Sequence, residues 1–513
     1  MLQNIQNHKY YPLLLYVVGL TALLFFVDFF FYLTQPAAGY HFWRQTDSIS
    51  FVAYYYENGM IFFEPGTYAM NIGNGRAASE FPILYYITAA LWHVFGRHDY
   101  ILKLVDSTIV FTGFYCLFKI AIKQIGNVYT ALVLILLFLS STTLLFYTNN
   151  FIPDPPSLGF TLIGAYFFFL FIEKKQYKFF VWAIVFLTIS VLIKPSMAGF
   201  LLTITGLLVF EKLFKATINT TQVFNQNIAK YLLPLFASAS LIIGWILWVK
   251  QYNNANVSYI FLTQIVPYWK SSAKEIAQVW DNVQNVWYGH YYYFTTLHVF
   301  LVIAILGLIN IKKWGRINIY IFVFLLIGAV GYVLLFFKQF GLHDYYIIPL
   351  FILLAFAIIF SLASVFNRFP ILKRSIIPSL ALIVLTILSL NFANKKMESR
   401  RFVNDINPQL FELAGKLEQY GVPKGATIYS FPDATPNGSL YYLQRKGYTN
   451  WSLVGKNNLK NNLSAYFSNK ADYMVISKPN FYEFANTPFY QTQQVGTYKD
   501  IRMYKIIHAN NGN

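Results

Sequence analysis

Long apolar segments recur along the chain from residue 12 to residue 392, and short polar breaks separate them. An α-helix needs about 20 predominantly apolar residues to cross the hydrocarbon core of a bilayer. The pattern predicts eleven spans and therefore an α-helical polytopic membrane protein. The spans lie roughly at residues 12–33, 101–122, 128–147, 157–172, 179–193, 197–213, 230–250, 294–311, 317–337, 345–365 and 375–392.

Basic residues gather in alternate breaks between these segments. Loops that are rich in Lys and Arg remain on the cytoplasmic side of a membrane. The other breaks, which hold Asp154, Lys194 and residues 338–344, are therefore expected outside the cytoplasm. The predicted cytoplasmic clusters are Lys119 with Lys123 and residues 173–178, 211–215, 312–316 and 368–374.

One apolar stretch, residues 81–95, is not counted as a span. It is short for a transmembrane helix of about 20 residues. If it crossed the membrane, every later loop would change sides and the basic clusters would face outward, against the charge rule. We interpret it as an interfacial or re-entrant helix within a large first external loop, residues 34–100.

Residues 393–513 are polar, and Pro, Gly, Asn and Lys interrupt their short apolar runs. We predict two domains, 1–392 in the membrane and a small α/β domain at 393–513. The odd number of spans places the second domain outside the cytoplasm. Its expected elements are helices at 408–420 and 438–445, strands at 426–431 and 471–477, and a hairpin at 495–507 that turns at Lys499-Asp500.

Composition agrees with a membrane protein. Hydrophobic residues make up 57% of the chain and charged residues only 12%, far from the soluble average. The net charge of +18 lies largely in the short loops between apolar segments, so we expect no nucleic-acid partner. Cys116 is the single cysteine, which excludes an intrachain disulfide.

Two carboxylates are the strongest candidates for chemistry. Asp47 closes the run His41-Phe-Trp-Arg-Gln-Thr-Asp47 after the first span, and Asp154 lies in the polar break Asn150-Phe-Ile-Pro-Asp-Pro-Pro156. Acids that are kept at the mouths of membrane helices are costly there and are usually functional. Both are expected on the external side, so together they indicate a metal site or an acid/base site.

Four motifs in the first two hundred residues resemble those of the GT-C membrane glycosyltransferases. They are Trp43-Arg-Gln-Thr-Asp47, Glu80-Phe-Pro82, Pro153-Asp154 and Lys194-Pro195. Their order, spacing and shared side of the membrane are similar to bacterial glycosyltransferase family 39, near the protein O-mannosyltransferases and lipid A aminoarabinose transferases. The segment 338–349 and the C-terminal domain fit more loosely.

The resemblance implies that residues 1–392 transfer a sugar, with inversion, from a polyprenyl-phosphate donor. The acceptor would be a hydroxyl of a lipid, glycan or protein at the extracytoplasmic face of the bacterial plasma membrane. Asp47 is then the natural general base for the acceptor proton. Arg44 and Lys194 suit the donor phosphate, and the remaining residues expected to bind substrate are Arg76, Glu80, His343 and Tyr345.

A divalent metal ion bound by Asp47 and Asp154 is a further way to neutralise the phosphate. Ser48 stands where some relatives have a second acid, and Glu80-Phe replaces a commoner proline-rich continuation. The sequence therefore leaves the metal requirement and the identity of the sugar open.

Each candidate residue also has a structural alternative. Asp47 could form a loop ion pair with Arg44, and Asp154 or Glu80 could begin a helix, where an acid is favoured. Lys194 could be an interfacial lysine whose ammonium extends to water.

Two other function classes stay as alternatives. A transporter or flippase would need ionisable residues near the middle of the membrane and usually a structural repeat, whereas the predicted spans are nearly free of mid-depth charge. A polysaccharide polymerase or ligase would use a large later loop, and the loop 251–293 holds Glu275, Asp281 and His290. That loop lacks a repeated Arg-rich pattern, so sugar transfer is the preferred hypothesis.

Overall fold

The computed structural model describes residues 10–261, 265–401, 406–467, 470–487 and 489–507. The chain forms two compact units. The helical unit comprises Met1–Gln35, Lys103–Ile246 and Gln264–Ser399, and the mixed unit comprises Pro36–Leu102, Leu247–Thr263 and Arg400–Asn513. The first external loop and the C-terminal residues thus share one unit, a grouping that the sequence did not indicate.

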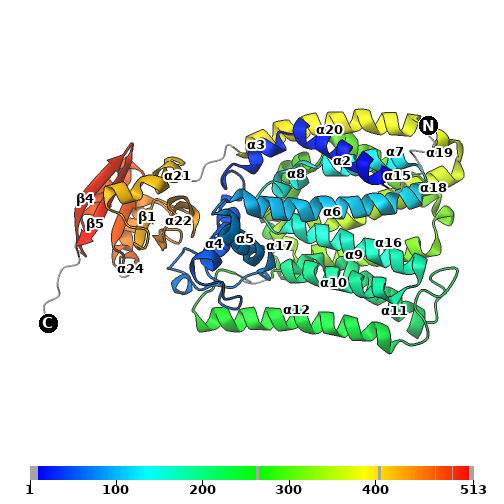
Figure 1. Cartoon of the computed structure of the whole chain (residues 1–513), viewed down its shortest axis with the longest axis horizontal. Helices are drawn as coiled ribbons and strands as arrows, with labels where there is room; N and C mark the ends of the chain where they lie inside the picture. Colours follow the sequence, from blue (N-terminus) through cyan, green and yellow to red (C-terminus); the bar gives the residue numbers. More distant parts are fainter. Residues whose placement is uncertain (1–9, 262–264, 402–405, 468–469, 488, 508–513) are drawn as a thin grey trace. The chain divides into compact units, whose positions relative to one another are not determined.

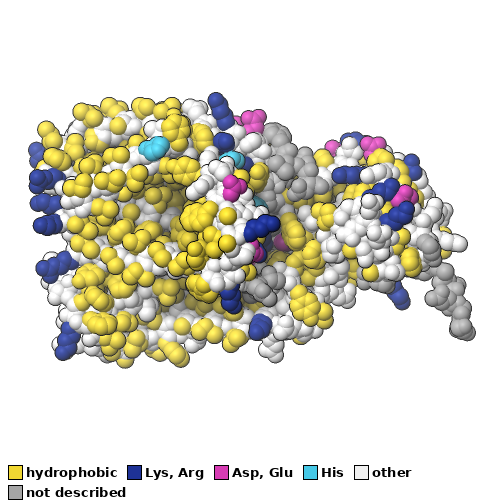
Figure 2. All heavy atoms as spheres, turned by 180° about the vertical axis from the view of Figure 1, so that it is seen from behind, with side chains coloured by type: hydrophobic (Ala, Val, Ile, Leu, Met, Phe, Trp, Pro, Cys, Tyr) yellow, Lys and Arg dark blue, Asp and Glu magenta, His cyan; other side chains and the backbone are white. Residues whose placement is uncertain are grey.

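Long apolar helices make up most of the helical unit (Figure 1). Apolar side chains cover much of its outer surface (Figure 2), as expected for helices that face lipid. The predicted class of polytopic helical membrane protein is confirmed. Among the described residues, seven helices are long and apolar enough to cross a membrane: α6 (Tyr100–Ile125), α9 (Asp154–Lys174), η2 with α11 (Pro195–Leu213), α12 (Ala229–Ala255), α16 (Arg316–Leu335), η6 with α18 (Asp344–Arg368) and α20 (Ile377–Arg401).

Two bent helix pairs could each form a further span. The first pair, α7 (Val128–Leu139) and α8 (Thr142–Thr148), meets at 76°. The second pair joins Ala273–Tyr291, which contains α13, η4 and α14, to α15 (Phe294–Ile309) at 94°. Length and composition thus support seven to nine spans among the described residues, and the total of eleven stays a prediction. The shorter apolar helices are α2 (Tyr11–Phe26), α5 (Ile83–Phe95) and α10 (Tyr177–Ile193).

The two bent pairs are hydrogen-bonded to each other at their bends. Ser141 caps α8 by accepting a hydrogen bond from the Leu144 amide at 3.4 Å, and its hydroxyl donates to the Tyr291 carbonyl at 2.9 Å. The Tyr292 hydroxyl donates to the Phe138 carbonyl near the end of α7 at 2.8 Å. The predicted span over α7 and α8 is therefore broken, because side chains satisfy the backbone groups that the helix ends leave open.

Helices α9 and α10 pack along each other and carry two candidate residues at one end. Asp154 begins α9 and Lys194 follows the last residue of α10, so the antiparallel pair brings them together. Along the interface, the Ser157 hydroxyl donates to the Ser190 carbonyl at 2.8 Å, and Thr161 and Ser190 share a hydroxyl hydrogen bond of 2.7 Å. Such polar pairs help to hold helices together within lipid.

The C-terminal residues form a sheet, in which Figure 1 labels β1, β4 and β5. The sheet has five strands in the order β2-β1-β3-β5-β4. β1 (Ile428–Phe431) lies parallel to β2 (Gly447–Thr449) and to β3 (Tyr473–Ile476). β5 (Ile501–Ile507) lies antiparallel to β3 and to β4 (Gln491–Tyr498). Buried aromatic side chains, among them Tyr429, Phe431 and Tyr466, fill the core beside the sheet.

The order of elements predicted for this region is confirmed. α21 (Gln409–Leu413) continues into η7 (Ala414–Tyr420), and Gly421 ends it with a φ of 76°, which glycine adopts readily. α22 (Gly438–Leu443) follows β1, and the β4–β5 hairpin turns at Lys499. The strand β2 was not predicted, because three residues carry too little alternation to be recognised.

The first external loop packs against this sheet region within the mixed unit. Its helix α4 (Phe42–Glu57) contacts α5 and α22. The backbone of Tyr68 and Met70 hydrogen-bonds to Gly447 at the start of β2, at 3.0 and 2.7 Å. The edge of the sheet and α4 are therefore held next to each other.

Candidate active site

Asp47 lies in α4 and is buried, with 2% of its surface exposed. The side-chain amide of Asn437, just before α22, donates a hydrogen bond to Asp47 Oδ1 at 2.7 Å. Asn437 is itself held, because its Oδ1 accepts a hydrogen bond from the Ala69 amide at 3.0 Å. One carboxylate oxygen of Asp47 therefore has a fixed donor from the C-terminal region.

Burial raises the pKa of the Asp47 carboxyl to about 7. The positive charge of Arg44 and the hydrogen bond from Asn437 oppose this rise, and the negative charge of Glu80 adds to it. A carboxylate with a pKa near 7 is partly ionised at neutral pH and still binds a proton well. Asp47 therefore has the properties of a general base.

Arg44 and Glu80 form an ion pair within the same unit. Glu80 also accepts hydrogen bonds from the hydroxyls of Ser79 and Tyr85. Burial and the charge of Glu80 raise the pKa of Tyr85 well above its usual value, so this phenol stays a donor at neutral pH. Arg44 and Asp47 are three residues apart in α4, on one face as predicted, so Glu80 holds the Arg44 guanidinium on the face that carries Asp47.

Arg76 lies apart from this cluster. It follows the short helix η1 (Gly73–Gly75), and its side chain is exposed. Burial raises the pKa of Tyr54, and the nearby charge of Arg76 opposes that rise. The mixed unit thus brings Arg44 and Glu80 to Asp47 and leaves Arg76 at its surface.

Asp154 and Lys194 form an ion pair in the helical unit, with 3.0 Å between Oδ2 and Nζ. The Lys194 ammonium also lies over the rings of Tyr345 and Tyr346, 5.4 and 5.5 Å from their centroids, a geometry that attracts a cation. The ring of His343 stacks on Tyr345 at 5.2 Å. Four predicted residues, Asp154, Lys194, His343 and Tyr345, therefore form one cluster.

Asp344 was not predicted and is completely buried in this cluster. The Tyr147 hydroxyl from α8 donates to Asp344 Oδ1 at 2.6 Å, and the rings of Tyr147 and Tyr345 meet edge to face at 5.5 Å. A signal was present in the sequence, since Asp344 is an acid at the mouth of a predicted span, next to His343.

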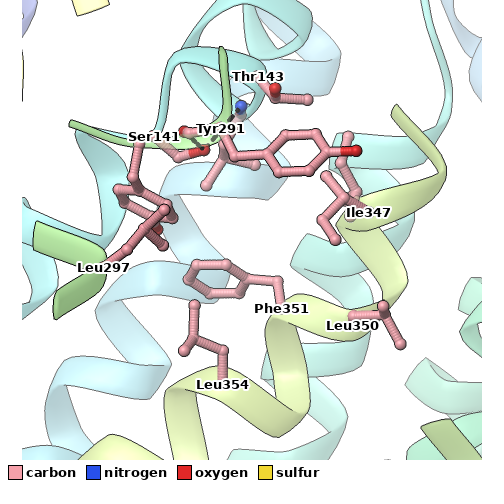
Figure 3. Close-up of a pocket in the computed structure, with 11 residues that line it drawn as sticks. Ser141, Thr143, Tyr291, Leu297, Ile347, Leu350, Phe351 and Leu354 are labelled. Carbon is pink, nitrogen blue, oxygen red and sulfur yellow. Dashed lines mark hydrogen bonds between the residues drawn. The ribbon is translucent and has the colours of Figure 1, made fainter. Parts of the chain in front are cut away.

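An apolar cavity of about 220 Å³ is built by the same elements that carry Tyr147 and Asp344. Leu144 lines it one turn before Tyr147 on α8, and Ile347 lines it from η6. Figure 3 shows the ring of Phe351 and the side chains of Leu297 and Leu354 pointing into the same space. The walls are almost wholly apolar, so the cavity suits a hydrocarbon chain rather than a sugar.

The predicted residues other than Arg76 thus form one group in each compact unit. The meeting of Asp47 with Asp154 stays a prediction, because the first lies in the mixed unit and the second in the helical unit. Among the residues that the structure describes, no three His, Cys, Asp or Glu side chains gather as a metal site. Neither group therefore provides a usual ligand set for a divalent ion by itself.

Comparisons with known proteins identify the fold. The model of the family described as dolichyl-phosphate-mannose-protein mannosyltransferase matches residues 79–248. ArnT from Cupriavidus metallidurans in the apo state aligns over 95% of this chain and 97% of its own, with a TM-score of 0.60 and 11% identity. The same protein bound to undecaprenyl phosphate aligns over 97% of this chain and 98% of its own, with a TM-score of 0.59 and 11% identity.

A further solved structure is similar over part of its length. The oligosaccharyltransferase of Archaeoglobus fulgidus aligns over 98% of this chain and 75% of its own, with a TM-score of 0.55 and 10% identity. No protein with a curated description matches the chain in sequence. The chain is a membrane protein with the GT-C glycosyltransferase fold, and the resemblance predicted from its motifs is confirmed at the level of the fold.

Proposed function

Starting from the GT-C fold, we propose that the protein transfers a sugar, with inversion, from a polyprenyl-phosphate donor to an acceptor hydroxyl. The reaction is assigned to the extracytoplasmic face of the bacterial plasma membrane, following the charge pattern of the loops. The observation that supports this most is the buried Asp47 carboxylate, whose pKa is about 7 and which Asn437 holds by a hydrogen bond.

Inversion takes place by a single displacement. The acceptor oxygen bonds to the anomeric carbon while the bond from that carbon to the phosphate oxygen breaks. The acceptor proton passes to Asp47, and the polyprenyl phosphate leaves with the bonding electrons. General base catalysis of this kind contributes roughly 10²–10⁴-fold.

The cluster around Lys194 suits the phosphate of the donor. Asp154 and the two tyrosine rings restrict the position of the ammonium, so little freedom is lost when it binds an anion. A charge-assisted hydrogen bond from Lys194 would stabilise the leaving phosphate. The apolar cavity beside this cluster would take the first part of the polyprenyl chain, in keeping with the undecaprenyl phosphate that ArnT binds.

We also assign Arg44 to the binding of a negatively charged group of the substrate. Its planar guanidinium can make two hydrogen bonds to one phosphate, and Glu80 holds it in place. A divalent ion at Asp47 or Asp154 stays a separate proposal, and its chemistry would be neutralisation of the phosphate charge. In the proposed reaction, residues of the chain bind the donor, orient the substrates and accept the proton, and none of these steps depends on such an ion.

The polymerase or ligase alternative relied on acids of the loop 251–293. In the described part of that loop, Glu275 closes a capping box with Ser272 at the start of α13 and pairs with Lys338 at 2.8 Å. Asp281 accepts a hydrogen bond from Asn285 at 2.7 Å. These acids have local structural partners, so the observations favour transfer through Asp47.

Transfer by the purified protein is the test. The protein in lipid nanodiscs would receive polyprenyl phosphates that carry different labelled hexoses and pentoses, with envelope lipids and glycans of a deletion strain as acceptors. We expect one donor to label an acceptor and to release polyprenyl phosphate, and Asp47→Asn to lower both by at least ~100-fold. A flippase would be supported instead by two results together: the lipid-linked sugar stays on the inner leaflet in the deletion strain, and the purified protein transfers no sugar in vitro.

A further inference from the structure

A second cavity, of about 230 Å³, lies between α6, α9 and the first turn of α16. Lys and Arg side chains gather at this end of the helical unit (Figure 2), where α6 and α9 end and α16 begins. Apolar side chains form most of the cavity wall, and several polar side chains complete it. The apolar walls include Ile120, Phe169, Leu170 and Ile317, and the residues with polar groups are Lys119, Lys123, Gln124, Tyr166, Glu173 and Asn318.

Lys119 differs from the other lysine of this cavity. Lys123 pairs with Glu173. Lys119 is half-buried and lies four residues before Lys123 on α6, about 6 Å deeper along the helix axis. Among the described residues, no carboxylate, carbonyl or aromatic ring pairs with its ammonium. An ammonium at that depth is costly without an anion.

Asn318 adds a hydrogen-bond acceptor to the cavity, and this acceptor indicates that a ligand with a donor group binds there. Only 8% of its surface is exposed, and its amide nitrogen donates to Gln124 Oε1 at 2.9 Å. Its Oδ1 is buried and has no hydrogen-bond partner among the residues that the structure describes. A buried carbonyl without a donor is unfavourable, so the cavity is best filled by a ligand that carries both an anionic group and a hydroxyl.

The apolar walls of the cavity indicate which class of anionic ligand fits it. A free phosphate ion would satisfy Lys119 but would leave the apolar lining of the cavity uncovered. A zwitterionic lipid would bring a quaternary ammonium toward Lys119. An anionic glycerophospholipid would fit all three features, since its phosphate could pair with Lys119, its headgroup hydroxyl could donate to Asn318 and an acyl chain could cover the apolar wall.

We propose that the cavity between α6, α9 and α16 binds one anionic glycerophospholipid of the adjacent leaflet, with the lipid phosphate on Lys119. The site is separate from the proposed transfer reaction and does not depend on it. It makes the stability of the helical unit sensitive to the anionic lipid content of the membrane, because a ligand that binds only the folded protein stabilises it.

Native mass spectrometry of the purified full chain tests this site. The detergent-solubilised protein would be titrated with phosphatidylglycerol and with phosphatidylcholine of the same acyl chains. We expect one phosphatidylglycerol to bind the wild type at least about ten-fold more tightly than phosphatidylcholine, the size of one hydrogen bond to a charged group. Lys119→Met should remove this preference, whereas Lys178→Met, which removes a charge at the same end but outside the cavity, should preserve it.

A variant that fills the cavity distinguishes a lipid bound in it from a Lys119 side chain that only extends to the membrane surface. Leu170→Trp keeps every charge and occupies part of the cavity, so it should weaken phosphatidylglycerol binding as Lys119→Met does. Binding that Lys119→Met weakens and Leu170→Trp leaves intact would overturn the cavity assignment. Equal affinity for the two lipids, or full competition by inorganic phosphate or by a polyprenyl phosphate, would overturn the assignment of a glycerophospholipid.

Discussion

The side-chain amide of Asn437 donates a hydrogen bond of 2.7 Å to Asp47, although 390 residues separate the two in sequence. Asn437 is fully buried, and its other end accepts from the Ala69 backbone. Asp433 supports the loop by accepting hydrogen bonds from the amides of Thr435 and Ser439. Asn437 is therefore a positioning residue, which orients the Asp47 carboxylate and stabilises its charged form.

Replacement of Asn437 should move the pH dependence of transfer. Without this donor the charged form of Asp47 loses a favourable contact, so its pKa should rise above 7. The base acts when it is deprotonated, and activity on the acid side should therefore disappear at a higher pH. We expect a shift of roughly one unit for Asn437→Ala, since one unit corresponds to about 1.4 kcal/mol.

The pH profile of kcat/KM measures this shift, and Asn457→Ala is the control. Asn457 is exposed in the same unit, so its replacement should leave the profile unchanged. A merely structural role for Asn437 would lower activity equally at all pH values, and that outcome would contradict the positioning role.

Glu80→Gln should move the same profile in the opposite direction. The negative charge of Glu80 adds to the pKa of Asp47, so its removal should lower this pKa and extend activity to more acidic pH. Maximal activity should also fall by roughly ten-fold, because Arg44 loses a charged partner. The matched control is Glu57→Gln, which breaks the 3.0 Å ion pair with Arg97 in the same unit. A shift of the acid limb to higher pH would contradict the assignment of Asp47 as the base.

Asp47→Asn should abolish transfer and change how stability depends on pH. An acid whose pKa is raised in the folded state stabilises the fold while it is neutral and loses this contribution as pH rises toward its folded pKa. For Asp47 this loss occurs between about pH 4 and pH 7. Asparagine does not titrate, so the Tm of the variant relative to wild type should increase over this range. Retention of more than about 1% of wild-type activity would remove Asp47 from the proton-transfer step.

The sequence predicted those parts of the site that depend on local geometry. Arg44 and Asp47 share a face because α4 is helical there. Asp154 and Lys194 were predicted on the same side of the membrane, but their ion pair, which forms because two successive helices are antiparallel, was not predicted. The class of protein followed from hydropathy alone. These relationships need only helix periodicity and the charge of the loops.

The contact between Asn437 and Asp47 could not be predicted in this way. It depends on the packing of α22 against α4 and on the backbone hydrogen bonds that join Gly447 to Tyr68 and Met70. No pattern in either segment indicates the other. Similarly, the break between α7 and α8 depends on the contact of Ser141 with Tyr291, which forms between distant parts of the chain.

Lys194→Gln should weaken binding of the donor phosphate while it preserves the apolar cavity. Loss of one charge-assisted hydrogen bond is expected to cost on the order of ten-fold or more in affinity for a polyprenyl phosphate. Binding of an uncharged polyprenol should change little, since the lining residues of the cavity are untouched. Lys338→Gln is the control, because Lys338 also pairs with an acid but is much more exposed. Equal losses for the two ligands would show that Lys194 has a structural role.

Cysteine labelling should establish the side of the membrane on which the first loop lies. In a Cys116→Ala background, Asn74→Cys and Gln176→Cys place single thiols at two exposed positions. Gln176 lies among Lys174, Lys175 and Lys178, which should keep it cytoplasmic. An impermeant maleimide should therefore label Asn74→Cys in intact spheroplasts and Gln176→Cys only after permeabilisation. Labelling of both thiols from outside would mean that an even number of spans separates them, because residues 81–95 cross the membrane or because the bent pair α7 and α8 does not, and it would contradict a site that Asp47 shares with Asp154 and Lys194. The reversed pattern would place the first loop in the cytoplasm and would contradict extracytoplasmic transfer by Asp47.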